Sequence, residues 1–422
     1  MRSIEYERYF VAFRLETPLT IGTGMDAQNH RVTLRHIPGS VMRGSLGRLL
    51  YRDEGLTSNP LRETDTPGSP VLDELFGIGG IRFGPLYPAW DEGDFGKQLH
   101  QRVLETMVIP LSTWTCKTEP GLTYGQRYED SGHIVIDYAL PDDHQVIKVA
   151  ECKCGGRLER LRGYVVRVKD HSRDANHWVR VSPSVHTKTR VGLNRQSATA
   201  EPGILYSIQS VQPILYLDSQ EPQKNLVFAG HWSMTKEQHA SLIKRLRPHR
   251  GDVGYALAVG ARQANGFGQG MLWIADKPEV IGDCLAIHHP DDGKMVFTLT
   301  ARSPIVCRDE AGIAQVVLSP DVIRGYYPDA PNFRLLESGI FVERARASGW
   351  SGLWGLSKPV ADCISPGSAF SYISDASPKE LSPFLEDLAR NGLGEMLEDG
   401  FGQVEVNHGF HQHFGVKEEG ND

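Results

Sequence analysis

A glycine-rich stretch in the middle of the chain has the composition of an anion-binding loop. It reads GARQANGFGQG, from Gly260 to Gly270, and contains no acidic residue. Glycine adopts backbone conformations that other residues avoid, so such a loop can turn its N–H groups toward phosphate oxygens. The stretch has neither the G-x-x-x-x-G-K-[ST] pattern of a P-loop nor the G-x-G-x-x-G dinucleotide pattern. Phosphate is therefore the first ligand to consider, and a purely structural turn is the alternative.

The Gly-Phe-Gly-Gln sequence of this loop occurs again near the C-terminus, in DGFGQVEV from Asp399. A strand-like run follows each copy, MLWI from Met271 in the first case and VEV from Val404 in the second. Two copies of one local device indicate two related domains. The length of 422 residues accommodates two or three domains with their own cores.

Three cysteines have the residue types of a zinc site. Cys152 and Cys154 flank a single residue and precede two glycines, whose N–H groups can bond thiolate sulfurs. Cys116 is the natural third ligand and His133 the fourth. The alternatives for the fourth ligand are His144 and His171. We expect a structural zinc in an insertion at about residues 111–164, although a metal-free knuckle fits the same spacing. No carboxylate stands at a motif spacing that would indicate a catalytic zinc.

Basic residues are unevenly distributed along a chain whose formal net charge is −7. No Asp or Glu occurs from Ala27 to Arg52, where five arginines do, and a second basic cluster runs from Lys244 to Arg250. A locally basic groove on an acidic protein suits a bound polyanion. The sequence lacks a signal peptide and an apolar run of membrane-spanning length, so we expect a cytoplasmic protein without membrane contact.

Periodicity and capping signals predict the elements that position these groups. Tyr9 to Gly22 alternates as a strand, and a helix is expected with Ser40 as its N-cap and Arg43 off its apolar stripe. The N–H groups at the start of that helix would be available to an anion. Thr235 has the capping-box spacing to Gln238 and predicts a second helix.

The C-terminal part is expected to form a second domain after a polar linker at 275–294. VLDELFG before it predicts a short helix, IRFGPLYP from Ile81 a hairpin, and SPFLEDLARNGLG a helix that begins at Ser382 and ends at glycine. Trp350 and Trp354 fit core packing or stacking on bases. The histidines near the C-terminus fit a loose tail better than a metal site. They are His408, His411 and His413.

Three segments resemble the RAMP superfamily of CRISPR-associated proteins. They are IPGSVMRGSLG from Ile37, VGLNRQSATAEPGILYSIQS from Val191 and the GARQANGFGQG loop. The resemblance implies an α+β fold of two ferredoxin-like, RNA-recognition-type βαββαβ domains, at 1–275 and 290–415, with the cysteine-containing insertion in the first. The CKTEPG and CKCGG segments and the second Gly-Phe-Gly turn are most similar to the large Cas-five-like RAMP subunit of type III-D effector complexes.

The resemblance also implies a function. Such a subunit binds RNA in a type III CRISPR effector complex, holds the 5′ repeat-derived tag of the CRISPR RNA, and contacts the large polymerase-like subunit and a backbone RAMP subunit in antiviral defence. The loop at about 184–203 is similar to a thumb-like hairpin that touches the guide RNA in RAMP proteins. The residues expected to contact RNA are His36, Ser40, Arg43, Lys117, Lys188, Arg190, Asn194, Arg195, Arg262, Gln263, Asn265, Gly266, Phe267, Gly268 and Gln269.

Two other classes of function compete with RNA binding alone. Backbone subunits of type III complexes cut target RNA with an aspartate from a loop similar to that of Asp26, which implies a metal-dependent endoribonuclease as the alternative. Acid–base trimming of the guide through His30 or His36 would be a second enzymatic route. Cas-five-like relatives generally cap the guide rather than cut, so we expect no catalytic residue. A scaffold that touches only protein is the remaining interpretation.

Overall fold

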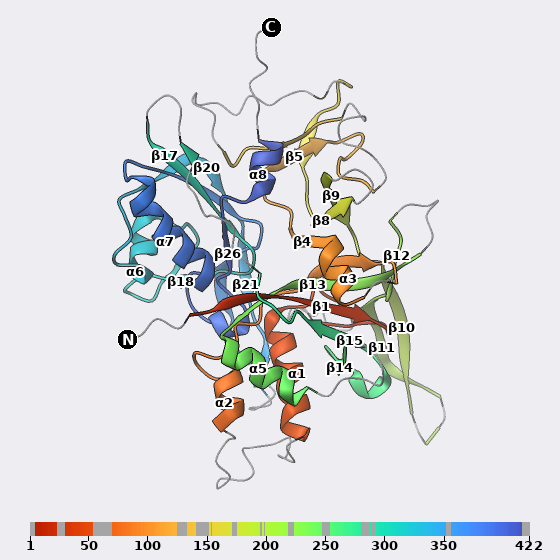
Figure 1. Ribbon diagram of the computed structural model, residues 1–422. Helices are drawn as coiled ribbons and strands as arrows, with labels where there is room; N and C mark the ends of the chain where they lie inside the picture. Colours follow the sequence, from red (N-terminus) through yellow and green to blue (C-terminus); the bar gives the residue numbers. More distant parts are fainter. Residues whose placement is uncertain are drawn as a thin grey trace.

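The computed structural model describes most of the chain. The described residues are 5–22, 30–53, 70–93, 95–124, 133–140, 152, 154–170, 175–194, 196–197, 199–217, 223–246, 254–279, 287–288, 293–351 and 356–415. Two large β-sheets with flanking helices dominate the structure, and smaller sheets and a projecting arm extend from them (Figure 1). Within the described ranges, no helix is long and apolar enough to cross a membrane.

The first large sheet is built around β1 (Glu7–Leu15). Its antiparallel path runs β12 (Ile214–Leu215), β13 (Lys224–Met234), β1, β15 (Gln269–Ile274) and β14 (Tyr255–Ala258), and β3 (Tyr87–Asp91) also pairs with β13. Helix α1 (Gly39–Asp53) follows β1, and α5 (Lys236–Arg245) follows β13. In chain order this unit is therefore β1-α1-β3-β13-α5-β15, and its four main strands lie in the order β3-β13-β1-β15.

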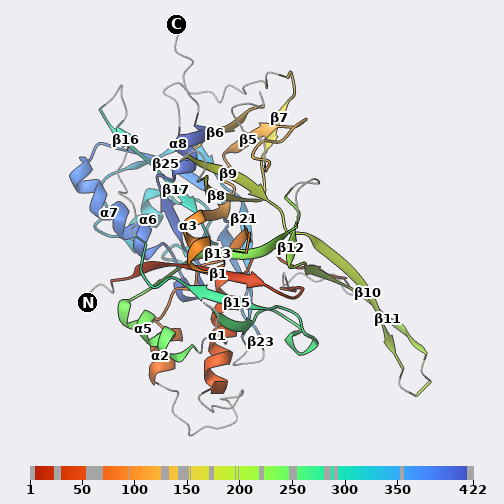
Figure 2. The same cartoon turned by 45° about the vertical axis from the view of Figure 1, so that its right-hand side comes forward.

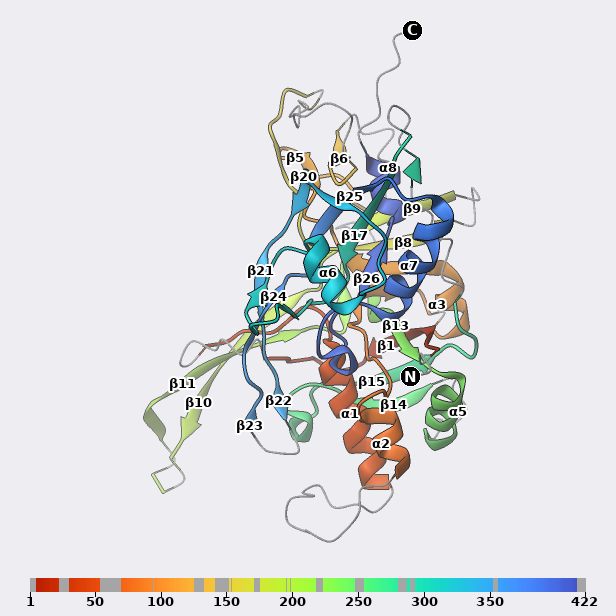
Figure 3. The ribbon, with the colours of Figure 1, turned by 90° about the vertical axis from the view of Figure 1, so that its left-hand side faces the viewer.

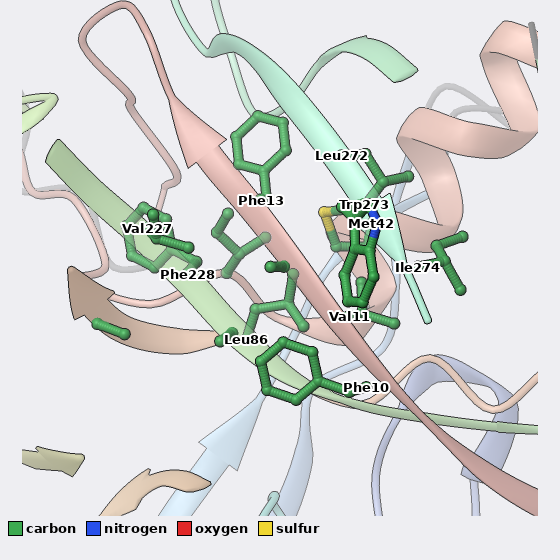
Figure 4. Close-up of a cluster of buried hydrophobic side chains, with 14 of the residues drawn as sticks. Phe10, Val11, Phe13, Met42, Leu86, Val227, Phe228, Leu272, Trp273 and Ile274 are labelled. Atoms are coloured by element: carbon green, nitrogen blue, oxygen red, sulfur yellow. The ribbon is translucent and has the colours of Figure 1, made fainter. Parts of the chain in front are cut away.

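The middle of strand β1 is buried on both faces, which explains its continuous apolar run from Tyr9 to Phe13 where alternation was expected. Its residues from Phe10 to Phe13 are at most 1% exposed. Because successive side chains of a strand point to opposite faces, such a run needs cover on both sides. Met42 of α1 and Leu272 of β15 belong to the same cluster (Figure 4). Full burial of a side chain of this size stabilises the fold by about 1.5–3 kcal/mol.

The second large sheet repeats this arrangement. Its strands are β16 (Ile287–His288), β17 (Met295–Ala301), β25 (Ala369–Ser374), β20 (Arg334–Phe341) and β26 (Val404–Val406). Helix α6 (Pro320–Tyr326) follows β17, and α7 (Pro378–Asn391) follows β25 (Figure 3). The order β20-β25-β17-β26 matches that of the first sheet when the elements are counted along the chain. We call the two assemblies unit 1 and unit 2.

Each unit carries an insertion between its second and third main strands. In unit 1 it comprises α3 (Lys97–Arg102), the sheet β4 (Val103–Val108), β8 (Tyr164–Asp170) and β9 (Ala175–Val181), and the small sheet β6 (Val135–Asp137), β5 (Thr113–Cys116) and β7 (Leu158–Arg160). It ends in β10 (Val185–Leu193) and β11 (Ala200–Val211), a long hairpin that projects from the molecule (Figure 2) and pairs at its base with β2 (His30–Arg31). In unit 2 the insertion comprises β21 (Arg344–Ala347), β22 (Trp350–Ser351), β23 (Leu356–Ser357) and β24 (Ala361–Ile364).

Short elements complete the described structure. They are α2 (Pro70–Phe76), β18 (Cys307–Arg308), β19 (Ala314–Gln315), α8 (Gly409–Phe414) and the 3₁₀ turns η1 (Gln263–Asn265) and η2 (Leu397–Asp399).

Capping residues explain where the expected helix boundaries are right or wrong. The side chain of Thr235 accepts the N–H of Gln238, whose own side chain accepts the N–H of Thr235, which confirms the predicted capping box. Helix α7 ends at Gly392 as expected, but its start at Ser382 is wrong because the Ser377–Glu380 capping box lies more than a turn earlier. Likewise α1 begins at Gly39, so Ser40 is inside the helix rather than at its N-cap.

The hairpin expected from Ile81 is also wrong. The segment forms only isolated bridges, from Arg82 to Ser233 and from Leu86 to Ile37, before β3 pairs with β13. The apolar residues that indicated a hairpin strand are instead buried in the core, because Ile81 and Phe83 are fully enclosed.

Buried charges join the two units. The guanidinium of Arg302, at the end of β17, is 6% exposed and donates to Glu105 (2.8 Å) and to Glu405 (2.7 Å). Arg8 of β1 donates to the same Glu405 (3.1 Å). Breaking one partner of such a group leaves an uncompensated buried charge, which is strongly destabilising.

Two C-terminal histidines, His408 and His411, belong to this joint and His413 lies on α8, so the expected loose tail is wrong. His408 contacts Glu105 (2.7 Å), and His411 lies between Asp137 (2.8 Å) and the hydroxyl of Thr300 (2.6 Å). The side chains of Thr300, His411 and Asp137 are at most 1% exposed, so this Thr–His–Asp arrangement offers no access to a substrate. It fastens α8 to the insertion of unit 1 and to the first strand of unit 2.

Candidate nucleic-acid interface and metal centre

The glycine loop of unit 1 is a tight, well-defined turn. Arg262 precedes the 3₁₀ turn η1 with left-handed φ and ψ values of 61° and 30°. Gly266, which ends η1, is also left-handed, with a φ of 79°. Two glycines have different tasks there. A Cβ on Gly268 would overlap the carbonyl oxygen of Val259, whereas a Cβ on Gly266 would meet nothing within 4 Å. Gly268 is thus required for packing, and Gly266 faces open space.

The second half of this turn does not offer its backbone N–H groups to a ligand. Those of residues 265 to 269 all donate within the protein, for example Gly268 to the carbonyl of Pro18 (2.9 Å) and Gln269 to the hydroxyl of Thr17 (2.9 Å). The Gln263 amide is also engaged, because it donates to the carbonyls of Ala258 (3.0 Å) and Gly260 (3.1 Å). An anion beside residues 265 to 269 would therefore be bound by side chains rather than by a backbone cradle.

The projecting arm presents its basic face to the turn. Arg190 pairs with Tyr206 across the arm, and Lys188 pairs with Ile208, which pairs in turn with Arg31 of β2. Directly opposite residues of neighbouring strands project from the same face. The guanidinium of Arg262 lies over the ring of Tyr206, 5.6 Å from its centroid. The basic face of the arm therefore continues into the glycine turn.

Helix α1 adds a further charge to this surface. Arg48 is exposed and donates to the side-chain oxygen of Gln263 (3.3 Å). No acidic residue occurs in the sequence from 184 to 200 or from 254 to 275. We call this surface the basic platform and define it by Arg31, Arg48, Lys188, Arg190, Tyr206 and Arg262.

Sequence reasoning missed three members of this platform as contact residues, Arg31, Arg48 and Tyr206. Tyr206 belongs to no motif. Its position opposite Arg190 is apparent only from the register of β10 and β11. Arg48 could have been found, since it lies in the acid-free run before residue 53 and one turn beyond the Arg43 that we selected.

Several residues expected at the RNA lie elsewhere. His36 is enclosed by Tyr87 and Tyr164, its Nδ1 is 3.0 Å from the Tyr164 hydroxyl, and burial lowers its pKa to about 4. It is therefore neutral at pH 7 and carries no charge for a phosphate. Arg43 donates to Asp399 (2.6 Å) and to the carbonyl of Phe76, at the joint between the units.

The remaining expected contacts divide between structural roles and exposed positions. Asn194 accepts the N–H groups of Gln196 (2.9 Å) and Ser197 (3.2 Å) and so shapes the tip of the arm. Lys117 is exposed beside Cys116, in the small sheet far from the arm (Figures 1 and 2). Asn265 and Gln269 are exposed on the turn, and Phe267 is half-buried there. Asp26, Arg195, Trp354, His144 and His171 lie outside the described residues, as do the side chains of His30 and Trp350.

The C-terminal Gly-Phe-Gly-Gln turn has the same backbone as the first. Met396 precedes η2 with φ and ψ of 61° and 35°, and Gly400 ends η2 with a left-handed φ of 85°. The hydrogen bonds correspond as well. Gly268 and Gly402 donate to Pro18 (2.9 Å) and Pro304 (2.8 Å), and the carbonyls of Gln269 and Gln403 both accept at 2.9 Å, from Glu16 and Arg302. Equivalent positions are thus Arg262 and Met396, Gln263 and Leu397, and Asn265 and Asp399.

The second turn is covered by unit 1 rather than exposed. A Cβ on Gly400 would overlap the carbonyl oxygen of Phe83, and the same oxygen lies against Gly39 at the start of α1. Asp399 is 8% exposed and receives both Arg43 and Lys358 (2.6 Å each). The beginning of α1, which we expected to face an anion, therefore lies against the backbone of unit 2, and Arg43 further along the helix binds the carboxylate of Asp399.

The predicted metal ligands converge in the small sheet. Cys116 ends β5, His133 precedes β6, and Cys152 and Cys154 precede β7, with all four ligand atoms within 4.8 Å of one another. Two sulfurs on a tetrahedral zinc at about 2.3 Å stand roughly 3.8 Å apart. The separations here are 3.5 Å between the sulfurs of Cys116 and Cys154 and 3.6 Å between Cys152 and Nδ1 of His133.

The surroundings of this cluster favour a bound cation. The backbone N–H of Glu119, with help from His133 and Cys154, lowers the pKa of Cys116 to about 6, so its thiolate is available at neutral pH. Nε2 of His133 is 2.8 Å from the carboxylate of Glu119, which leaves Nδ1 as the ligand atom. A carboxylate behind a ligating histidine is a usual feature of zinc sites. These four residues could therefore hold a metal ion.

Comparison with known proteins assigns the family. The family model of the RAMP superfamily matches residues 12–270, more than half of the chain. The chain belongs to the RAMP superfamily. The match covers the end of β1, all of α1 and the arm, and the glycine turn of unit 1, so the basic platform of this RAMP protein lies within the matched region. A search of curated protein sequences found no match.

Solved structures of type III-B Cmr-beta are similar to this RAMP protein over most of its length. Two of these complexes are bound to cognate target RNA, one with AMPPnP and one without it. In each, a chain 12% identical to this protein aligns over 86% of both chains. The TM-score is 0.37 for the complex with AMPPnP and 0.38 for the complex without it. A chain of the apo state, at 10% identity and a TM-score of 0.26, covers 65% of this chain and 98% of its own. At these TM-scores the likeness carries no argument about the present chain.

Proposed function

We propose that this RAMP protein is an RNA-binding subunit of a type III CRISPR effector complex and that its basic platform holds the 5′ tag of the CRISPR RNA. The observation that carries the proposal is the difference between the two matching turns. The buried turn has Met396, Leu397 and Asp399 where the exposed turn has Arg262, Gln263 and Asn265. The acidic residue is thus absent where the turn is open to solvent, and an arginine stands there instead.

The platform combines the two contacts that single-stranded RNA needs. Arginine and lysine side chains bind phosphates, and their affinity falls as the salt concentration rises. An aromatic ring offers a face on which a base stacks. Lys188 and Arg190 are exposed on the arm, and Tyr206 lies between Arg190 and Arg262. The exposed amides of Asn265 and Gln269 would supply hydrogen bonds to base edges. No catalytic group is part of this proposal.

The finer assignments follow the same reasoning. We assign the chain to the large Cas-five-like subunits of type III-D complexes and its two units, at 1–275 and 290–415, to ferredoxin-like domains, which the matching strand orders support. The proposed protein partners are the large polymerase-like subunit and a backbone RAMP subunit. Exposed apolar side chains near the arm tip support a protein contact, since Leu193 is 66% and Leu205 59% exposed.

The cysteine cluster is proposed to bind a structural zinc. Cys116, His133, Cys152 and Cys154 would hold the ion, which would tie the ends of the small sheet together. We expect about one zinc per chain by elemental analysis of the purified protein, and none in the Cys116→Ser/Cys154→Ser variant. Full zinc content in that variant would assign the metal to other residues.

Replacing two platform arginines tests the RNA assignment. We expect Arg190→Ala/Arg262→Ala to weaken binding to RNA with a repeat-derived 5′ tag by about tenfold or more and to lower the salt slope by about 1.4, for two lost phosphate contacts. Arg157→Ala/Arg334→Ala removes two exposed arginines away from the platform and serves as the matched control. Wild-type affinity in the platform variant would contradict the proposal. Cleavage of the RNA on a denaturing gel in the presence of Mg²⁺, lost in Asp26→Asn, would support the nuclease alternative instead.

A further inference from the structure

A second cationic site lies in the joint between the units, at the opposite end of β1 from the basic platform. It is a pocket with about 380 Å³ of space that protein atoms do not fill, part of it open to solvent. Four arginines line it, namely Arg8, Arg82, Arg302 and Arg390. Polar groups of Ser233 and Gln403 complete its wall, and no acidic residue belongs to the lining.

The charges of this joint pocket are only partly compensated. Arg8 and Arg302 share Glu405, and Arg302 also binds Glu105, so these two cations are matched by two carboxylates. In the part of the chain that the structure describes, neither Arg82 nor Arg390 has a carboxylate within 4.0 Å. Two half-buried positive charges thus remain at one pocket, where the reduced dielectric strengthens their attraction for an anion.

Arg82 is held in place and retains donor capacity. Its guanidinium lies over the ring of Tyr6, 4.0 Å from the centroid, and donates to the carbonyl of Asn391 at the end of α7. Its buried Nε–H has no acceptor among the described groups. Buried donors are nearly always satisfied, so an unsatisfied arginine N–H beside a pocket calls for an explanation.

We propose that this joint pocket binds a phosphate group. Four arginine residues border one space, and arginine forks bind the oxygens of phosphate bidentately. Because residues of both units line the pocket, the bound phosphate stabilises the joint between them. The group comes either from free inorganic phosphate or from the terminal phosphate of an RNA.

The joint pocket is independent of the RNA site proposed above. Arg8 lies at the start of β1, whereas the glycine turn bonds to Glu16 just after its end. Eight residues of extended chain separate these positions by roughly 25 Å. Failure of the platform variants to change RNA binding therefore leaves the phosphate site untouched, and the converse also holds.

Calorimetric titration of the full chain with inorganic phosphate, at ionic strength held constant with chloride, tests the proposal. We expect saturable binding to the wild type, and affinity at least tenfold weaker for Arg390→Gln, because the lost group is a charged donor. Arg390 has no ion-pair partner within the described ranges, so its replacement should leave the melting temperature in chloride unchanged. Arg334→Gln, an exposed arginine of the same unit outside the pocket, is the matched control.

Each outcome decides the proposal. Absence of saturable phosphate binding by the wild type, or equal affinity in Arg390→Gln, would overturn it. A second arm compares short RNAs with a 5′-phosphate and a 5′-hydroxyl. A preference for the phosphorylated RNA that Arg390→Gln abolishes assigns the group to an RNA end, whereas no preference, together with saturable inorganic phosphate binding, assigns it to free phosphate.

Discussion

The two Gly-Phe-Gly-Gln turns of this protein share a backbone and differ in almost everything that surrounds it. Both begin with a left-handed non-glycine residue at φ 61°, continue as a 3₁₀ turn and close on a glycine whose N–H bonds to a proline carbonyl. One is open to solvent beside a basic arm, and the other is pressed against the start of α1. The turn is therefore a structural device, and its surroundings determine whether it is available to a ligand.

This comparison changes how the glycines should be understood. Their density indicated a phosphate cradle, yet the N–H groups of residues 265 to 269 all have partners inside the protein. The same bonds recur in the second copy, whose backbone is packed against unit 1. The ligand specificity of the exposed copy must then reside in the side chains that differ between the copies, above all in Arg262.

The largest predicted effect comes from adding one methyl group to each turn, by replacing Gly266 or Gly400 with alanine. Gly266 and Gly400 have nearly equal φ values of 79° and 85°, so alanine at either position has the same backbone strain, about 1–2 kcal/mol. At Gly400 the added Cβ also overlaps the Phe83 carbonyl oxygen and forces the units apart, which adds about 1–3 kcal/mol. We expect Gly400→Ala to lower the free energy of urea unfolding by about 3 kcal/mol or more, and Gly266→Ala by half of that or less.

Equal destabilisation by the two alanines would mean that the second turn does not depend on its contact with unit 1. Gly266→Ala serves as the control for strain, because a Cβ there meets nothing within 4 Å.

Acid should destabilise the joint between the units by protonating its carboxylates, such as that of Glu105. Burial alone would raise the pKa of Glu105, but the charges of His408 and Arg302 outweigh it and lower the value to about 2. A carboxyl group with a depressed pKa stabilises the fold above its unfolded value near 4.5 and loses that contribution as the pH falls toward 2. The loss is about 3 kcal/mol. Urea unfolding between pH 6 and pH 3 would capture about 2 kcal/mol of this loss, because the remainder appears only at lower pH.

Replacement of Glu105 by glutamine should flatten that pH dependence, since the variant has no carboxyl group to protonate at this position. An equally steep fall in the variant would place the acid sensitivity elsewhere. The exposed turn is held by hydrogen bonds of neutral groups, so it has no comparable dependence on pH.

The sequence was most informative where one local signal decides the structure. The capping box at Thr235, the end of α7 at Gly392 and the repetition of Gly-Phe-Gly-Gln are signals of this kind. The cluster of Cys116, His133, Cys152 and Cys154 was also predicted, although Cys116 lies far from Cys152 in the chain, because closely spaced cysteines followed by glycines are typical of a metal-binding knuckle.

What the sequence could not indicate depends on contacts between distant segments. Arg43 lies off the apolar stripe of its helix, and only the docking of unit 2 brings Asp399 to it. His36 is neutral because Tyr87 and Tyr164, distant in sequence, enclose it. Tyr206 joins the platform through strand register, which a single sequence does not determine for an exposed hairpin.

The smallest predicted effect exchanges the residues that open the two turns. Met396 occupies the same left-handed conformation as Arg262, so Arg262→Met should keep the backbone and change the free energy of unfolding by less than about 0.5 kcal/mol. It removes one charged contact to RNA, and we expect affinity for tagged RNA to fall about tenfold, or 1.4 kcal/mol. The reciprocal Met396→Arg adds a positive charge at the covered turn and should leave RNA affinity unchanged, because that turn lies against unit 1. Fluorescence anisotropy with both variants measures the difference. If Met396→Arg altered RNA binding as strongly as Arg262→Met, or if Arg262→Met bound like the wild type, exposure of the first turn would no longer explain which copy contacts RNA.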